Sequence, residues 1–183
     1  ARRLGFGARI LESGRVHVRT DPARCAEPVV LDDAWGPVAI YPLPYLEPAV
    51  VAGTLEVEHA DHEGVLGAAM TAVRADAARR GAASGGLRSV VAAHAFVVGG
   101  EPSDSERDIS VGGVASVPVG VFDGPDYVAL GHLHGRQRLG DRVRYSGSPL
   151  PYSFSEHRQV KGSWLVELDR GGLARVDAVP APV

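Results

Sequence analysis

Residues 126–134 read Asp-Tyr-Val-Ala-Leu-Gly-His-Leu-His, the most informative stretch of the sequence for the fold. Residues 126–130 form a short apolar run that ends at a glycine, which is typical of a buried strand. Residues 87–93 have the same character and end at His94. Strands that are apolar almost throughout belong to the parallel sheets of α/β proteins. The sequence therefore predicts an α/β fold in which histidines follow two buried strands.

A helix is expected to begin after Asp61, which is suited to an N-cap. Apolar residues then recur at helical spacing: Val65, Leu66, Ala69, Met70 and Val73. Residues 79–81, Arg-Arg-Gly, resemble a helix C-terminus, and residues 81–86 are expected to be a flexible connection. Strand and helix then alternate along the chain, which also favours an α/β class.

Further strands are expected on both sides of this core. The apolar runs 28–31 and 37–43 flank the turn-forming residues 32–36, and this pattern predicts a hairpin. Three later segments alternate as strands do: residues 142–146, 164–168 and 174–179. Residues 169–172 are expected to be the turn between the last two, and residues 101–108 a charged loop.

Composition limits the class of protein. The single cysteine, Cys25, excludes an internal disulfide framework and a cysteine-rich zinc site, so a cytoplasmic location is expected. The longest weakly polar stretch, residues 111–122, is too short to span a bilayer, and no secretory signal is visible. The net charge of -3 argues against binding nucleic acid by bulk charge, so any DNA contact must be local.

Three histidines are candidate metal ligands. His132 and His134 lie one residue apart at a strand end, from which imidazoles project toward metal ions in many proteins. His94 also ends an apolar strand, and parallel sheets collect functional groups beyond the carboxyl ends of their strands. The alternatives stay open: the pair as solvated loop residues, and His94 as a hydrogen-bonded core residue. The other histidines, His17, His59, His62 and His157, give no such signal.

The chain resembles the SbcD-type DNA-repair nucleases of the calcineurin-like metallophosphoesterase superfamily. The resemblance is carried by short motifs in the family's order: residues 3–7 (Arg-Leu-Gly-Phe-Gly), 91–96 (Val-Ala-Ala-His-Ala-Phe), 99–100, 105–107 (Ser-Glu-Arg), 126–134, Gln137, 145–150 (Tyr-Ser-Gly-Ser-Pro-Leu) and 154–156 (Phe-Ser-Glu). It implies an αββα sandwich with two divalent metal ions, Mn²⁺ being the family's choice. His94 and His132 would bind one ion and His134 the other, with no catalytic residue beyond these ligands.

The resemblance also implies an activity and partners. The complete protein would be a 3′-to-5′ exonuclease on duplex DNA and an endonuclease on single strands, acting with an SbcC-type ATPase. A homodimer is compatible with it, and no membrane is involved. Two rivals remain: another calcineurin-like phosphodiesterase, which the motif at residues 145–150 disfavours, and a non-catalytic scaffold of the same fold.

The family's first three metal motifs, Asp-x-His, Gly-Asp-x-x-Asp and Gly-Asn-His-Asp, do not occur in this sequence. We therefore expect residues 1–183 to be the C-terminal portion of a nuclease domain, with 179–183 as a linker to a missing capping region. Neutral imidazoles bring no negative charge to hold two dications, so carboxylates must come from elsewhere. The chain alone is expected to carry an incomplete site.

Basic residues after the histidine pair are weaker candidates for DNA contacts. They are Arg136, Arg138, Arg142 and Arg144, and Ser148 lies in the turn that follows. Arginines close to the metals would meet the DNA backbone. Alternating arginines are also common on exposed strand edges, so a solvated hairpin edge is the favoured interpretation.

Overall fold

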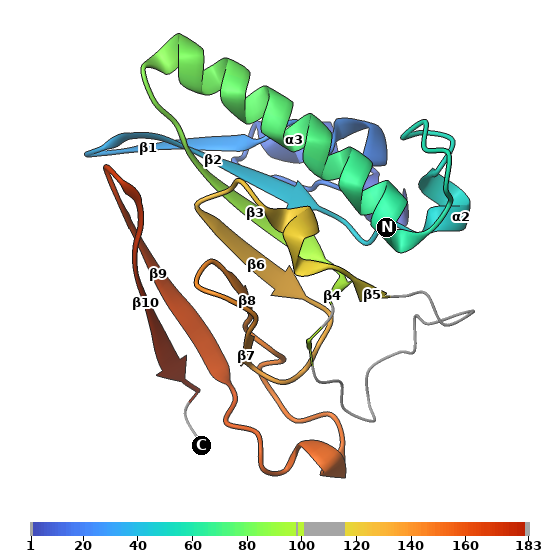
Figure 1. Cartoon of the computed structure of the whole chain (residues 1–183), viewed down its shortest axis with the longest axis vertical. Helices are drawn as coiled ribbons and strands as arrows, with labels where there is room; N and C mark the ends of the chain where they lie inside the picture. The colour runs from blue at the N-terminus through green and yellow to red at the C-terminus, as the bar shows by residue number, and fades with distance from the viewer. Residues whose placement is uncertain (1, 98, 101–115, 182–183) are drawn as a thin grey trace.

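A mixed six-stranded sheet forms the centre of the chain (Figure 1). The computed structural model describes residues 2–97, 99–100 and 116–181. In spatial order the strands are β1 (Val29–Asp33), β2 (Gly36–Leu43), β3 (Arg88–His94), β6 (Tyr127–Gly131), β8 (Val143–Tyr145) and β7 (Gln137–Arg138). The expected hairpin, the strand before His94 and the strand before His132 are all present.

The four central strands are parallel, and this arrangement positions the candidate site. β2 pairs with β3, β3 with β6, and β6 with β8, all in parallel, while β1 and β7 are antiparallel at the two margins. Parallel strands end at one edge of a sheet. The residues that follow β3, β6 and β8 therefore meet at the same edge, and the α/β class is confirmed.

Helix α3 (His62–Ser84) packs across one face of the sheet (Figure 1). The Asp61 carboxylate accepts a hydrogen bond from the Gly64 amide at 2.7 Å, so the expected N-cap is correct. The helix ends three residues later than Gly81, because Gly85 adopts the left-handed conformation of a C-cap. Residues 81–84 are thus helical, and the flexible connection expected there was wrong for most of its length.

The core lies between α3 and the sheet. Alternate residues of β2 and β3, among them Tyr41 and Val91, are buried under the apolar side of α3. The buried Tyr41 hydroxyl donates to Asp76 at 2.9 Å, and Arg80 pairs with the same carboxylate. On the opposite face, residues such as Ile40 and Val90 are only half-buried. In the described residues, helix α3 thus forms one layer on one face of the sheet. The αββα sandwich stays a prediction.

A second hairpin, β9 (Gly162–Asp169) and β10 (Gly172–Pro180), lies beside the sheet (Figure 1). It is anchored by Trp164, whose indole N–H donates to the Tyr145 carbonyl oxygen at 2.9 Å. Both strands and the turn between them were expected. β10 runs to Pro180, so the first two residues of the expected linker, 179–180, are strand; residues 182–183 and the loop 101–108 lie outside the described residues.

The shorter elements connect these parts: η1 (Arg2–Gly5), α1 (Ala8–Glu12), η2 (Pro22–Arg24), α2 (Pro48–Val51), β4 (Phe96–Val97), β5 (Ser116–Val117), η3 (Val119–Phe122) and η4 (Phe154–Glu156). β4 and β5 form a small parallel pair directly beyond the end of β3. No helix in residues 2–97, 99–100 or 116–181 is long and apolar enough to cross a membrane.

The hydroxyl of Tyr145, at the end of β8, ties the sheet to the segment after His94. Tyr145 is fully buried; its hydroxyl donates to the Ala95 carbonyl oxygen at 2.7 Å and accepts from the Val97 amide at 3.0 Å. Burial raises the pKa of this phenol, so it stays protonated and can serve as a donor.

We predict that Tyr145→Phe lowers the free energy of unfolding by about 1–3 kcal/mol, because two buried backbone groups lose their partner. Tyr152→Phe is the matched control, since Tyr152 is 62% exposed. Urea denaturation of the three proteins measures the difference. Equal stability of Tyr145→Phe and the parent would show that these hydrogen bonds do not hold the segment.

Candidate metal centre

The carboxyl edge of the parallel strands brings candidate ligands together. His94 is the last residue of β3 and pairs in register with Gly131, the last residue of β6. His132 follows Gly131 directly, so the two imidazoles start from adjacent strand ends. The two buried apolar strands hold the backbone in place as far as His94 and Gly131. This fixes where both imidazoles start.

The His94 and His132 rings are in contact. Nε2 of His94 lies 3.3 Å from Nδ1 of His132, and the ring centroids are 5.2 Å apart. Two nitrogens that ligate one ion at roughly 2.1 Å, with tetrahedral or octahedral angles, lie about 3.0–3.4 Å apart. The observed spacing matches two ligands of one divalent ion, and it also matches an N–H···N hydrogen bond between the two rings.

His94 is also in a suitable protonation state. The residue lies at an exposed edge, but its ring packs against Tyr45 and His132, with the Tyr45 ring edge-on at 5.8 Å. This partial burial lowers the pKa of His94. A lowered pKa favours the neutral imidazole, which is the form that ligates metals.

His132 has a backbone conformation that side chains rarely adopt. Its φ is 120°, whereas an L residue other than glycine is sterically disfavoured at positive φ. Strained backbone of this kind concentrates at functional sites, where surrounding structure holds a side chain in a required direction. Here the constraint turns the chain sharply at the end of β6 and places the His132 ring against His94 and Phe96.

His134 lies in a separate polar cluster. Its Nδ1 is 2.9 Å from Oε1 of Glu156, and its ring lies 5.3 Å from that of Tyr152. Glu156 is 1% exposed although it is a carboxylate. The expected grouping of three histidines is thus observed as a contacting pair, His94 and His132, and a third ring, His134, with partners of its own.

Lys161 connects this cluster to the loop after β8. Its ammonium group donates to Oε2 of Glu156 at 2.6 Å, to the Ser148 hydroxyl at 2.8 Å and to the His134 carbonyl oxygen at 3.0 Å. Ser148 is buried, and its hydroxyl also donates to the Leu150 carbonyl oxygen. A DNA contact by Ser148 would require these neighbours to move.

Gly147 allows the loop to approach the histidine segment. Its φ is 81°, and a Cβ at this position would lie 2.5 Å from the His134 carbonyl oxygen and 3.0 Å from the Arg136 amide. Only glycine combines this backbone conformation with so close an approach. The Ser-Gly-Ser turn therefore packs beside His134. The sequence alone had assigned no role to this turn.

The four arginines divide into two pairs. Arg138 and Arg142 are exposed, and Arg138 forms an ion pair with Asp141. Arg144 is buried, and its guanidinium lies 5.3 Å from the centre of the Trp164 ring; that of Arg136 lies 5.2 Å from the same ring. The exposed-edge interpretation thus holds for the first pair, while the second anchors the β9–β10 hairpin by cation–π contacts.

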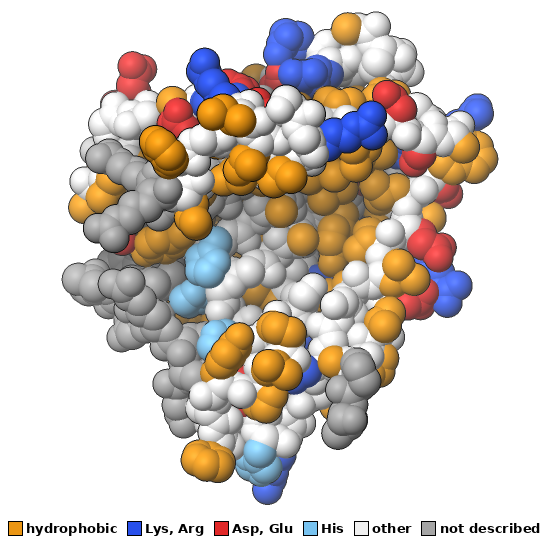
Figure 2. Space-filling model, turned by 180° about the vertical axis from the view of Figure 1, so that it is seen from behind, with side chains coloured by type: hydrophobic (Ala, Val, Ile, Leu, Met, Phe, Trp, Pro, Cys, Tyr) orange, Lys and Arg blue, Asp and Glu red, His pale blue; other side chains and the backbone are white. Residues whose placement is uncertain are grey.

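Acidic ligands are scarce around these histidines. Within the described ranges, no group of three or more His, Cys, Asp or Glu side chains is arranged to hold a metal ion. Figure 2 shows histidine side chains gathered beside a hollow that hydrophobic side chains partly border. The described residues could thus supply nitrogen ligands to a metal centre, but they do not supply the carboxylates that would balance its charge.

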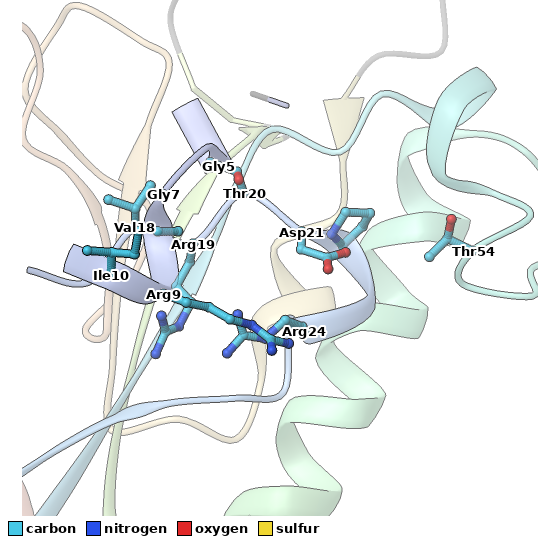
Figure 3. Close-up of a pocket in the computed structure, with 12 residues that line it drawn as sticks. Gly5, Gly7, Arg9, Ile10, Val18, Arg19, Thr20, Asp21, Arg24 and Thr54 are labelled. Atoms are coloured by element: carbon cyan, nitrogen blue, oxygen red, sulfur yellow. The ribbon is translucent and has the colours of Figure 1, made fainter. Parts of the chain in front are cut away.

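A cavity near the start of the chain lies away from the histidines. It has a volume of about 630 Å³ and is lined by η1, α1 and η2 with the residues that follow them, including Arg9, Arg19 and Arg24, but by no histidine (Figure 3). Glu12 pairs with Arg19, and Glu27 pairs with Arg24 at 2.5 Å. Because two of its three guanidiniums are neutralised, we place the candidate chemistry at the histidines.

Three contributors to the site were given no role from the sequence, although Glu156 lies in the motif at residues 154–156. Glu156 and Lys161 lie 22 and 27 residues beyond His134, and Tyr45 follows β2. The one signal for Lys161 was that it is the only lysine among nineteen basic residues. No protein-family model matches the sequence.

Proposed function

We propose that this chain supplies the histidine side of a two-metal phosphodiesterase centre in an SbcD-like nuclease that hydrolyses DNA with Mn²⁺. The observation that carries the proposal is the 3.3 Å spacing of His94 Nε2 and His132 Nδ1 at the carboxyl edge of a parallel sheet. In this proposal His94 and His132 hold one ion, and His134 contributes to the second.

The chemistry explains why such residues are needed. A phosphodiester is an anionic and weakly electrophilic centre, and attack on it creates further negative charge. Divalent ions held by His94, His132 and His134 would stabilise this charge and would make hydroxide available near neutral pH by lowering the pKa of bound water. The fixed histidine rings would hold these ions in place, and carboxylates from outside the described residues would offset the charge.

Binding of DNA must depend on a few local side chains, because the net charge of the chain is -3. Arg142 is exposed on the β7–β8 hairpin and could contact phosphate, whereas Arg138, which is also exposed, would have to exchange its ion pair with Asp141 for a phosphate. Tyr152 and Phe154 are 62% and 97% exposed in the segment that precedes Glu156, and such rings stack on unpaired bases. These positions fit a partner with phosphates and splayed bases. An SbcC-type ATPase and a second copy remain the expected protein partners.

The direct test is cleavage of end-labelled duplex DNA by the complete protein with Mn²⁺, beside a small phosphodiester such as bis(p-nitrophenyl) phosphate. We expect chelator-sensitive shortening of DNA from its 3′ ends. Hydrolysis of the small ester with intact DNA would favour the rival phosphodiesterase. Failure to cleave either substrate, together with no Mn²⁺ binding, would favour the non-catalytic scaffold and reject the proposal.

A further inference from the structure

The buried carboxylate of Glu156 has a geometry that determines how His134 can act. We propose that Glu156 is a positioning residue that fixes His134 in the Nδ1–H tautomer, so that the ring presents the lone pair of Nε2 to a metal ion. The metal-binding part rests on the proposed function, whereas the control of the tautomer rests on the contacts of Glu156 alone.

Each oxygen of the Glu156 carboxylate has a distinct set of partners. Oε1 lies 2.9 Å from Nδ1 of His134. Oε2 accepts from the Lys161 ammonium at 2.6 Å and from the Tyr152 amide at 3.2 Å. Lys161 and Glu156 are both almost fully buried as side chains, 8% and 0% exposed, so the ammonium stabilises the carboxylate in its charged form.

The tautomer of His134 follows from this arrangement. An ionised carboxylate only accepts hydrogen bonds, so the Nδ1 atom that contacts it must carry a proton. In a neutral imidazole the other nitrogen, Nε2, then holds the lone pair. Histidine ligands of metals commonly donate their second N–H to a carboxylate, which fixes the ring and raises its basicity.

Lys161 links the Glu156 carboxylate to two other parts of the site. It also donates to the Ser148 hydroxyl and to the His134 carbonyl oxygen, so it joins the carboxylate, the loop after β8 and the backbone of His134. The ring of His134 and its own backbone are thus held by the same cation through two routes. Movement of Glu156 away from His134 would also disturb its ion pair with Lys161, the group that holds the loop and the His134 backbone.

The variant Glu156→Gln separates the proposal from a merely structural role. The two donors at the Oε2 position, Lys161 and the Tyr152 amide, require the amide oxygen of glutamine to face them. The glutamine NH₂ group then faces Nδ1 of His134, which must become an acceptor. Glu156→Gln is therefore expected to reverse the tautomer, placing the proton on Nε2 and removing the lone pair from the metal side.

The experiment is long-range ¹H–¹⁵N NMR of the imidazoles in the metal-free, ¹⁵N-labelled 183-residue chain at about pH 8.5. His134→Asn identifies the His134 signals by their loss. The parent is expected to be protonated on Nδ1 and Glu156→Gln on Nε2. Glu167→Gln, at an exposed position of β9, should resemble the parent.

The spectrum of the parent protein can overturn the proposal by itself, whether or not the variant folds. A His134 ring protonated on Nε2 in the parent would do so. A folded Glu156→Gln protein that keeps the Nδ1–H tautomer would also overturn it, because Glu156 would then have only a structural role.

Titration with Zn²⁺ connects the tautomer to metal binding and separates this inference from the proposed function. Zinc should shift the His134 Nε2 signal in the parent, and Glu156→Gln should weaken that effect about 10–100-fold, the usual loss when the partner of a metal-bound histidine is changed. If the tautomer reverses as expected but zinc shifts none of His94, His132 and His134, the proposed function fails while control of the tautomer by Glu156 stands.

Discussion

Replacing His132 by alanine is expected to reduce Mn²⁺-dependent DNA cleavage by the complete protein on the order of a thousandfold. Losing one of two nitrogens that lie 3.3 Å apart disturbs both the affinity and the geometry of the ion they would share. A thousandfold corresponds to about 4 kcal/mol of lost transition-state stabilisation. Initial rates of cleavage at saturating Mn²⁺ measure the effect.

Two further variants make this result specific. His132→Gly also removes the ring but relieves the positive φ of 120°, so it should be as inactive as His132→Ala and more stable by about 1 kcal/mol. His157→Ala alters an exposed histidine and should change the rate by no more than about twofold. Equal damage from His157→Ala, or recovery of activity in His132→Gly, would refute the ligand role of His132.

The second large effect concerns the 183-residue chain alone, which is expected not to cleave DNA at a measurable rate. The described residues offer imidazoles but no cluster of carboxylates beside them, and Glu156 is engaged by Lys161. Without bridging negative charge, neither the phosphate clamp nor the activated hydroxide is assembled. Purified chain with Mn²⁺ and end-labelled duplex DNA tests this expectation.

The matched comparison is the same chain produced together with the aspartate-bearing motifs that the resemblance places before residue 1. Their addition should restore chelator-sensitive cleavage. Robust digestion by the chain alone, lost in His132→Ala, would show that these 183 residues contain a complete site. The expectation of an incomplete centre would then be wrong.

Local patterns predicted the elements that carry the histidines. Residues 87–93 and 126–130 are apolar almost throughout, and such runs leave little choice other than a buried strand. The start of α3 could be predicted equally well, because Asp61 is a favourable N-cap residue and stands directly before the run of helically spaced apolar residues. The end of α3 was misplaced, because Gly81 and Gly85 are both suitable terminators and local sequence does not distinguish them.

Contacts across the fold could not be predicted in the same way. The hydrogen bond between His134 and Glu156 depends on how the chain after β8 returns to the sheet edge, which no periodicity encodes. The burial of Arg144 was missed for a similar reason, because its cover, Trp164, lies on a hairpin whose position beside the sheet is set by tertiary packing. The alternation of arginines predicted a strand, but it could not predict which side chains would cover that strand.

Above all, we propose that His94 and His132 hold one divalent ion at the ends of β3 and β6. Anomalous X-ray diffraction from a crystal of the chain soaked in MnCl₂ tests it most directly. We expect a manganese peak within bonding distance of both His94 Nε2 and His132 Nδ1, about 2.0–2.3 Å from each nitrogen. A well-ordered histidine pair with no peak between the two rings, at a Mn²⁺ concentration that saturates binding in solution, would contradict it.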